Sequence, residues 1–367
     1  MPVYLDYNAT APIRPEVSDL MRELAAEPMN ASSVHGYGRK AKKWLEDARK
    51  TIAQHISAFP NEIIFTATGT EANVMALSGY PQRRVLISAV EHSSILKVAN
   101  CQLPVASEGN LDLVRLEQEL AQGVPALVSI QLANNETGIL QPISEIAALC
   151  KKHGALLHTD AVQALGKIPV DFSLLGADMM TLSAHKMGGV VGAACLVVRQ
   201  NLAIKPIFAG GQELGRRAGT ENIPAIAAFA KAVELMDLGQ MKELSQWMSK
   251  FESEIGQLGG QVVGKASPRL PNTSCIIMPG VSSEVQLMNA DLAGFAVSAG
   301  SACSSGRVEP SHVLRAMYLD DKLAGCAIRV SAGWKTTRQE LISYADYWQK
   351  TYCRLTKSSI PAGSANS

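Results

Sequence analysis

The sequence predicts an α/β fold in which a large domain has a mostly parallel sheet covered by helices and a smaller domain is α+β. Between about residues 60 and 200, short apolar runs alternate with helical patterns, which is typical of parallel strands joined by helices. After Glu221 the alternation stops, and a long helical stretch precedes strands that are separated by helices. The chain has 367 residues, 47% of them hydrophobic, which is enough for two domains with buried cores.

The expected strands of the first half are short runs rich in Val, Ile, Leu and Phe. They span residues 62–66, 84–88, 126–132, 155–159, 178–182 and 192–198. The expected helices span residues 70–77 and 144–153, and a further helix begins near Glu91. Ser144 is the expected N-cap of the 144–153 helix, and Gly154 lies just after its end. This order of elements predicts a sheet with both faces covered.

The second half begins with a long helical stretch expected from about Pro224 to Leu258. Strands are expected at residues 273–278, 295–298 and 327–331. The last helix is expected to open with Thr337 and Glu340, which have the spacing of a capping box. Residues 357–367 are small and polar, so we expect a disordered tail there.

The composition argues against several classes of protein. The net charge of +1, from 34 basic and 33 acidic residues, gives no long-range attraction to nucleic acid or to an acidic membrane. The longest apolar runs are far shorter than the ~20 residues of a membrane span, and the first residues lack a secretory signal, so we expect a cytoplasmic protein. The seven cysteines are odd in number and no two are spaced CxxC, so we expect neither a disulfide framework nor a metal site.

Several predicted strand ends carry reactive or charged groups, and ligands of parallel α/β sheets bind beyond the carboxyl ends of the strands. Lys186 follows the 178–182 strand. It could form a Schiff base with pyridoxal phosphate, or it could be a surface lysine. Asp160 follows the 155–159 strand. Its carboxylate could keep a pyridine nitrogen protonated, or it could cap a turn.

Three further groups follow strands in the same half. Gly69 and Thr70 open a helix whose N-terminus could bind a phosphate, although a threonine there could be a simple cap. His92 could stack on a cofactor ring and pass protons, or it could be structural. Residues 134–138 (NNETG) could line the same site or form only a turn. Each signal is weak alone, but their order along the chain is informative.

That order resembles the fold-type I pyridoxal-phosphate enzymes, specifically their class V branch, and the match is sharpest to the cysteine desulfurases. The resemblance covers the chain from Val3 to about Thr351. The segments that carry it are 4–10 (YLDYNAT), 30–35 (NASSVH), 68–73 (TGTEAN), 134–138 (NNETG), 158–163 (HTDAVQ), 210–213 (GGQE), 217–222 (RAGTEN), 301–306 (SACSSG) and 329–331 (RVS).

The resemblance implies roles around the cofactor ring. Lys186 forms the Schiff base with pyridoxal phosphate and later acts as a base at the substrate Cα. His92 stacks on the ring as a further catalytic residue, and Asn135 lies against the cofactor and the substrate. Asp160 pairs with the pyridinium nitrogen, while Gln163 reaches the ring hydroxyl.

The resemblance also implies how the cofactor phosphate is held. Gly69, Thr70, Ser183 and His185 bind it within one subunit. Thr220 binds it from the neighbouring subunit, so the protein is expected to be a homodimer.

For the reaction, the resemblance implies that Arg329 grips the substrate carboxylate and that Cys303 accepts sulfur from L-cysteine, which leaves as L-alanine. Cys303 lies among small residues and two glycines at 298–306, a composition that favours a flexible loop over a buried structural thiol. A selenocysteine lyase and a class V aminotransferase are the alternatives. A non-catalytic scaffold on the same fold is disfavoured because Lys186 and Cys303 are both present.

The implied organisation is a large cofactor-binding domain at residues 13–237 and a small domain formed by residues 1–12 and 238–356, which carries the Cys303 loop. The stretch from Cys303 to Arg329 resembles the group of desulfurases with the longer loop, which supplies iron–sulfur assembly or nitrogenase maturation. A sulfur acceptor or an iron–sulfur scaffold protein is therefore the expected partner.

Overall fold

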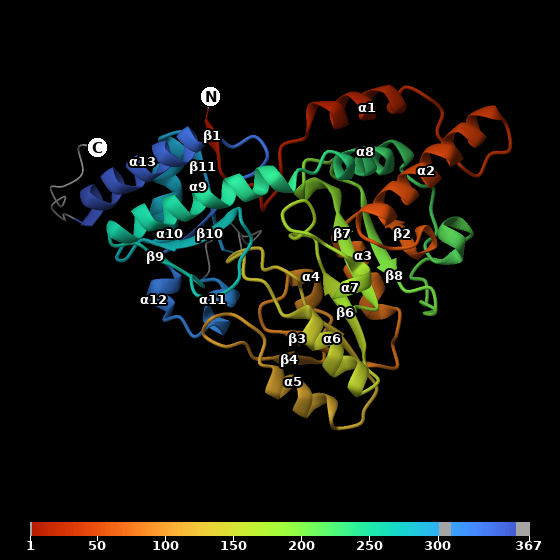
Figure 1. Ribbon diagram of the computed structural model, residues 1–367, viewed down its shortest axis with the longest axis horizontal. Coiled ribbons are helices and arrows are strands. Elements are labelled where there is room, and N and C mark those ends of the chain that lie inside the picture. The colour runs from red at the N-terminus through yellow and green to blue at the C-terminus, as the bar shows by residue number, and fades with distance from the viewer. Residues whose placement is uncertain (1, 301–309, 357–367) are drawn as a thin grey trace.

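The computed structural model describes residues 2–300 and 310–356. Figure 1 shows a large sheet with its helices on one side of the molecule and a smaller sheet, covered by long helices, on the other. The predicted disordered tail at 357–367 lies outside the described residues. No helix in the described ranges is long and apolar enough to cross a membrane.

The large sheet has seven strands in the order β2-β8-β7-β6-β5-β3-β4. Their bounds are β2 Ile63–Thr66, β3 Arg84–Ser88, β4 Cys101–Leu103, β5 Ala126–Ser129, β6 Leu156–Asp160, β7 Met179–Ser183 and β8 Ala194–Val198. Neighbours from β7 to β4 are parallel, while β8 is antiparallel to both β7 and β2. The expectation of a mostly parallel sheet is confirmed, although β4 was not expected and β5 ends three residues early.

Both faces of this sheet are buried, as the apolar strands predict. Cys195 and Val197 of β8 belong to one hydrophobic core, and Leu196 and Val198 belong to another, because successive side chains of a strand point to opposite faces. The helices of this part are α1 Pro15–Ala25, α2 Gly36–His55, α3 Gly69–Ser78, α4 Ser93–Leu96, α5 Leu113–Leu120, α6 Ile143–Lys152, α7 Phe172–Leu175 and α8 Ile223–Glu234. The second core includes the buried side of α3, and the first includes those of α2 and α8.

Two expectations about helices are wrong. Helix α6 begins at Ile143, with Pro142 at its N-cap and no side-chain cap, so Ser144 is inside the helix. The long stretch from Pro224 to Leu258 is two helices, because Asp237 interrupts it: its side chain accepts from the backbone N of Gln240 at 3.0 Å and caps α9, Leu238–Gln257.

The smaller part is built on a four-stranded antiparallel sheet in the order β12-β13-β10-β9. Its elements are β9 Gln261–Val262, β10 Thr273–Ile277, α10 Ser283–Leu292, β11 Phe295–Ala296, β12 Ser298–Ala299, α11 His312–Ala316, α12 Asp321–Ala324, β13 Ala327–Ser331 and α13 Arg338–Thr356. The capping box of Thr337 and Glu340 is confirmed. The strand expected at 295–298 is split between two sheets, since β11 pairs in parallel with β1, Val3–Tyr4.

A separate hydrophobic core lies in this smaller part. It contains Leu5 from the N-terminal segment, Phe251 of α9, and Tyr344 and Trp348 of α13. The start of the chain therefore packs with the second half rather than with the large sheet. The strand pairing of β1 with β11 carries the segment that follows, residues 6–10, to the junction of the two sheets.

A buried ion pair ties α2 to the edge of the large sheet. The Arg49 guanidinium donates to both carboxylate oxygens of Glu213 at 2.8 Å, and one of these oxygens also accepts from the backbone N of Phe65 at 2.9 Å. The Arg49 and Glu213 side chains are only 9% and 1% exposed. Glu213 and Leu214 both have positive φ angles, so this pair holds an unfavourable backbone conformation in place.

We expect Arg49→Met to destabilise the protein by about 3–5 kcal/mol, because the Glu213 carboxylate is left buried without a cation. The midpoint of urea unfolding measures the effect. Arg22→Ala is the control, since the Arg22–Asp19 pair is exposed and its loss should change the midpoint little. Equal midpoints for the two variants would contradict a stabilising role of the buried pair.

Candidate active site

A cavity of about 600 Å³ lies beyond the C-terminal ends of β6 and β7, and β12 and β13 of the smaller part also contribute to its lining. Every described residue that the sequence predicts as a ligand lines it except Thr220. These residues are Gly69, Thr70, His92, Asn135, Asp160, Gln163, Ser183, His185, Lys186 and Arg329. Thr220 is exposed and lies outside the cavity of its own chain, and the predicted sulfur acceptor Cys303 lies outside the described residues.

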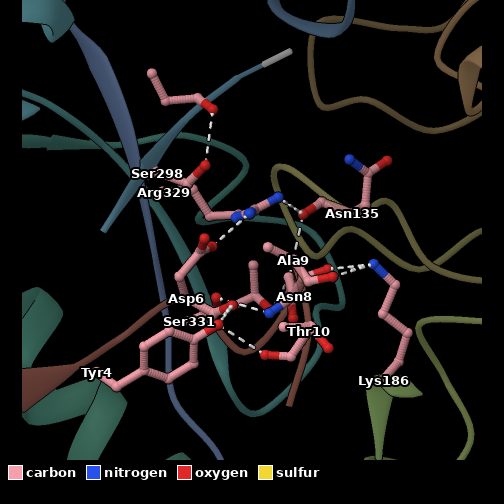
Figure 2. A network of polar contacts seen from close by, with 12 residues as sticks. Tyr4, Asp6, Asn8, Ala9, Thr10, Asn135, Lys186, Ser298, Arg329 and Ser331 are labelled. Atoms are coloured by element: carbon pink, nitrogen blue, oxygen red, sulfur yellow. Dashed lines mark hydrogen bonds and ion pairs between the residues drawn. The ribbon is translucent and has the colours of Figure 1, made fainter. Parts of the chain in front are cut away.

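Lys186 reaches into the cavity from the single 3₁₀ turn, Ala184–Lys186, that follows β7. Its Nζ donates to the carbonyl oxygens of Asn8 at 2.8 Å and of Ala9 at 2.7 Å, as Figure 2 shows. Burial, reinforced by the nearby Arg329 guanidinium and opposed by Asp160 and Asp6, lowers the pKa of Lys186 to about 8. The neutral amine that a nucleophile or a base requires is therefore more accessible than in an ordinary lysine.

Arg329, in β13, faces the same space from the smaller part. Its guanidinium donates to the Asp6 carboxylate at 2.6 Å and to the carbonyl oxygen of Asn135 at 3.0 Å (Figure 2). The side chain is 7% exposed and lines the cavity, and among the residues that the structure describes Asp6 is the carboxylate paired with it. A guanidinium that borders a cavity fits an anionic ligand group such as a carboxylate.

Asp160 ends β6 and is buried. One carboxylate oxygen accepts from the Asn73 amide nitrogen at 2.7 Å, and the other accepts from the backbone N of Val162 at 3.0 Å. In the described ranges, no Lys, Arg or His side chain forms an ion pair with it. A buried carboxylate with only neutral donors fits a cationic ligand group such as a protonated ring nitrogen.

The part of the cavity wall formed by the start of α3 has the features of a phosphate site. Gly69 is the first residue of α3, a ten-residue helix whose N-cap Thr68 accepts from the backbone N of Glu71. A Cβ at Gly69 would lie 3.2 Å from Val162 Cγ2, so a side chain there would crowd the cavity wall. His185 also lines the cavity, and burial lowers its pKa to about 4, so at neutral pH the imidazole is neutral and can donate a hydrogen bond.

His92 is the N-cap of α4 and is exposed to the cavity. Its Nδ1 contacts Ser94 Oγ at 2.8 Å and accepts from the backbone N of Ser94 at 3.2 Å. Ser94 Oγ in turn accepts from the Asn73 amide, the same amide that donates to Asp160. A continuous chain of hydrogen bonds therefore joins His92 to Asp160.

Several residues at the site were missed by reasoning from the sequence. Asn73 lies inside the predicted helix, and Ser94 follows His92 by two positions. Asn8 and Lys167 contact Gln163: its amide nitrogen donates to the Asn8 carbonyl at 3.0 Å, and its amide oxygen accepts from Lys167 Nζ at 2.6 Å. The signal for Lys167 was its spacing of four residues from Gln163. Asn8 belongs to the 4–10 segment that carries the resemblance, but nothing local predicts its contact with Gln163, which is 155 residues away in sequence.

The class-V aminotransferase family model matches residues 3–343. The chain belongs to this family. It is 40% identical to a protein named cysteine desulfurase IscS from Dictyoglomus turgidum, over 92% of this chain and 91% of that one. It is also 40% identical to a cysteine desulfurase from Rhodobacter capsulatus, over 92% and 93% of the two chains.

Among solved structures, a NifS-like protein from Rickettsia africae superposes with a TM-score of 0.89 at 34% identity, covering 96% of this chain and 99% of that chain. The predicted α/β fold of fold-type I enzymes and the resemblance to the class V branch are confirmed. Enzymes of this family depend on pyridoxal phosphate.

The low pKa of Lys186 gives a direct test of the site in the cofactor-free protein. The rate of acylation of Lys186 by an amine-specific reagent should rise with pH through a midpoint of about 8, and not through the ordinary value of 10.5, because burial disfavours the charged amine. Peptide mass spectrometry across a pH series measures this rate. Arg329→Met removes a cation that lowers the pKa, so its midpoint should lie higher. A wild-type midpoint near 10.5 would contradict this account of the site.

Proposed function

We propose that the chain is a pyridoxal-phosphate-dependent cysteine desulfurase that converts L-cysteine to L-alanine and leaves the sulfur as a persulfide on Cys303. The observation that carries the proposal is the meeting of Lys186, Asp160 and Arg329 around one cavity. The relatives at 40% identity that bear the name cysteine desulfurase cover 92% of the chain, and the family match at residues 3–343 includes Cys303.

The residues present fit pyridoxal phosphate. Lys186 would hold it covalently, Asp160 would face its ring nitrogen and His92 would stack on the ring. The phosphate would be bound by a separate group of residues: Gly69, Thr70, Ser183 and His185. When bound, the cofactor supplies an electron sink that stabilises negative charge at the substrate Cα.

The chain's own residues then bind the substrate and move protons. The Arg329 guanidinium, which lines the cavity, would bind the substrate carboxylate, and Asn135 lies beside it to orient the amino acid. Lys186, whose pKa is lowered to about 8, takes the proton from the substrate Cα. Arg329 lies in β13 of the smaller part and is held by Asp6, while Lys186 lies in the turn that follows β7 of the large sheet. The junction of the two parts therefore sets the distance between the guanidinium that would bind the substrate carboxylate and the amine that would act as the base.

Cys303 completes the reaction as the sulfur acceptor. Its sulfur forms a bond to the substrate sulfur as the substrate C–S bond breaks, and the three-carbon product takes up a proton at Cβ. The thiol of Cys303 and L-cysteine become a persulfide and L-alanine, so no external oxidant or reductant is needed. An aminotransferase has no use for this thiol, which favours the desulfurase over that alternative. Comparing the rates with cysteine and selenocysteine separates the desulfurase from a selenocysteine lyase.

The remaining expectations belong to the same proposal. One hydrophobic core lies against the large sheet and a separate one lies in the smaller part. This separation supports a large domain at 13–237 and a small domain from 1–12 and 238–356. The exposed position of Thr220, away from its own cavity, supports a homodimer in which it reaches the neighbour's phosphate site. A sulfur acceptor or iron–sulfur scaffold as partner, and a cytoplasmic location, stay predictions.

The function is tested with Cys303→Ser. This variant should keep the visible absorbance of the bound cofactor, and the band should shift when L-cysteine is added, because Lys186, Asp160 and Arg329 are unchanged. It should form almost no alanine, since a serine hydroxyl is a poor nucleophile toward sulfur. Mass spectrometry of the wild type after incubation with cysteine should find one added sulfur on Cys303.

Cys353→Ser, a half-buried cysteine in α13, is the matched control and should form alanine at the wild-type rate. Full alanine formation by Cys303→Ser would overturn the assignment of the sulfur acceptor. Loss of the cofactor band in that variant would mean that Cys303 is a structural thiol.

A second test concerns Asp160. Asp160→Asn replaces the buried carboxylate by a neutral amide, and a hydrogen bond to a charged group contributes on the order of 1.5–3 kcal/mol, so alanine formation should fall about tenfold or more. The rate is measured at saturating pyridoxal phosphate. Asp47→Asn, an exposed carboxylate on α2, is the control. A near-normal rate for Asp160→Asn would place the ring nitrogen elsewhere.

A further inference from the structure

The side chain of Lys167 is buried beside the cavity, and the reaction proposed above does not use it. The residue is 6% exposed, and its Nζ donates to Asn8 Oδ1 at 2.8 Å and to Gln163 Oε1 at 2.6 Å. No carboxylate in the described ranges forms an ion pair with it. A buried lysine without an anion is rare, because transferring a charged amine from water is unfavourable.

The charged groups that face Lys167 come from two elements and make its position less favourable still. Lys186, in the turn after β7, and Arg329, in β13, are both cations that lower the pKa of Lys167, and burial lowers it most. Lys167 in turn lowers the pKa of the neighbouring His185. The carboxylates of Asp6 and Asp160 act instead on Lys186. The protonated form of Lys167 is therefore destabilised by its surroundings. What its side chain contributes is two hydrogen bonds, one to Asn8 and one to Gln163.

Those two bonds decide the orientation of the Gln163 amide. A lysine amine donates hydrogen bonds in either protonation state here, so it selects the amide oxygen of Gln163 as its partner. The amide nitrogen must then lie on the other side, where one of its hydrogens is taken by the carbonyl oxygen of Asn8 at 3.0 Å. The second hydrogen of this nitrogen has no partner in the described residues, and Gln163 lines the cavity.

We propose that Lys167 is a positioning residue that orients the Gln163 amide so that a nitrogen-bound hydrogen, rather than the oxygen, is presented to the cavity. The inference rests on the proposed function, in which Gln163 faces the ring hydroxyl of pyridoxal phosphate. With Lys167 in place, Gln163 donates a hydrogen bond to that oxygen. Without Lys167, the amide can rotate by half a turn and present a carbonyl oxygen, which would repel it.

This orientation has a spectroscopic consequence. The proton that titrates in the lysine-bound cofactor lies between the Schiff-base nitrogen and the ring oxygen. A donor to the ring oxygen stabilises the deprotonated form and lowers the pKa of the visible band. Losing a hydrogen bond to a charged acceptor should raise that pKa by about one unit or more. A residue that only fills space would not change this value.

The test is a pH titration of the visible absorbance in the full-length holoenzyme. Lys167→Met keeps the length and apolar stem of the side chain and removes the donor, so the pKa of the band should rise by about one unit. Gln163→Leu should give a similar rise. Adding Lys167→Met to Gln163→Leu should give no further change, because Lys167 acts through Gln163. Lys43→Met, an exposed lysine on α2, is the control and should leave the band unchanged.

A wild-type pKa in Lys167→Met would overturn the proposal. A shift that persists in full in the Gln163→Leu background would also overturn it, since Lys167 would then act by its charge alone. If Lys167→Met does not fold, Lys167→Leu, which also lacks a donor, is titrated instead: a raised pKa supports the proposal and a wild-type pKa refutes it. A wild-type protein with no visible band on addition of pyridoxal phosphate would refute the proposed function itself, which keeps the two failures distinct.

Discussion

The site depends on one short stretch of backbone, residues 6–9, which lies at the junction of the two sheets. The carbonyl oxygen of Asn8 accepts from Lys186 and Gln163, the next carbonyl accepts from Lys186 again, and the Asp6 carboxylate holds Arg329. The Asn8 side chain also donates to Thr273 Oγ1 in β10 at 2.9 Å. Lys186, the predicted cofactor lysine, and Arg329, the predicted substrate-binding arginine, are thus positioned by the same segment. Lys186 follows a strand of the large sheet, whereas Arg329 lies in a strand of the smaller sheet.

This arrangement concentrates positive charge. Lys186 and Arg329 both lower the pKa of Lys167, and Arg329 also lowers the pKa of Lys186 against the opposing effects of Asp160 and Asp6. Burial, reinforced by Arg329, explains why the pKa of Lys186 falls to about 8 even though two carboxylates are near it. The basic side chains that line the cavity suit anionic groups, namely a phosphate and a carboxylate. The neutral carbonyl acceptors of residues 8 and 9 stabilise the lysine without neutralising it.

The sequence predicted the parts of the site that follow strands, because the end of a strand is a local feature. Asp160 and Lys186 were found in this way, and the order of such residues indicated the family. Asn8 and Lys167 were not found, since their importance depends on contacts across 155 or more residues or on burial that no short pattern reports. The helix break at Asp237 was missed because the apolar spacing continues on both sides of it, and only a capping contact interrupts it.

The split of the expected 295–298 strand shows how the smaller part reaches the cavity. Because β11 pairs with β1 while β12 pairs with β13, the chain passes from one sheet to the other between Ala296 and Ser298. Ser298 lies opposite Arg329 in the antiparallel register and lines the cavity, as does Gly300.

On the far side of the segment that contains Cys303, Ser311 donates to the buried Glu136 carboxylate at 2.5 Å, and the next residue, His312, lines the same cavity. The described residues that flank Cys303 on both sides therefore border the space where the substrate would bind.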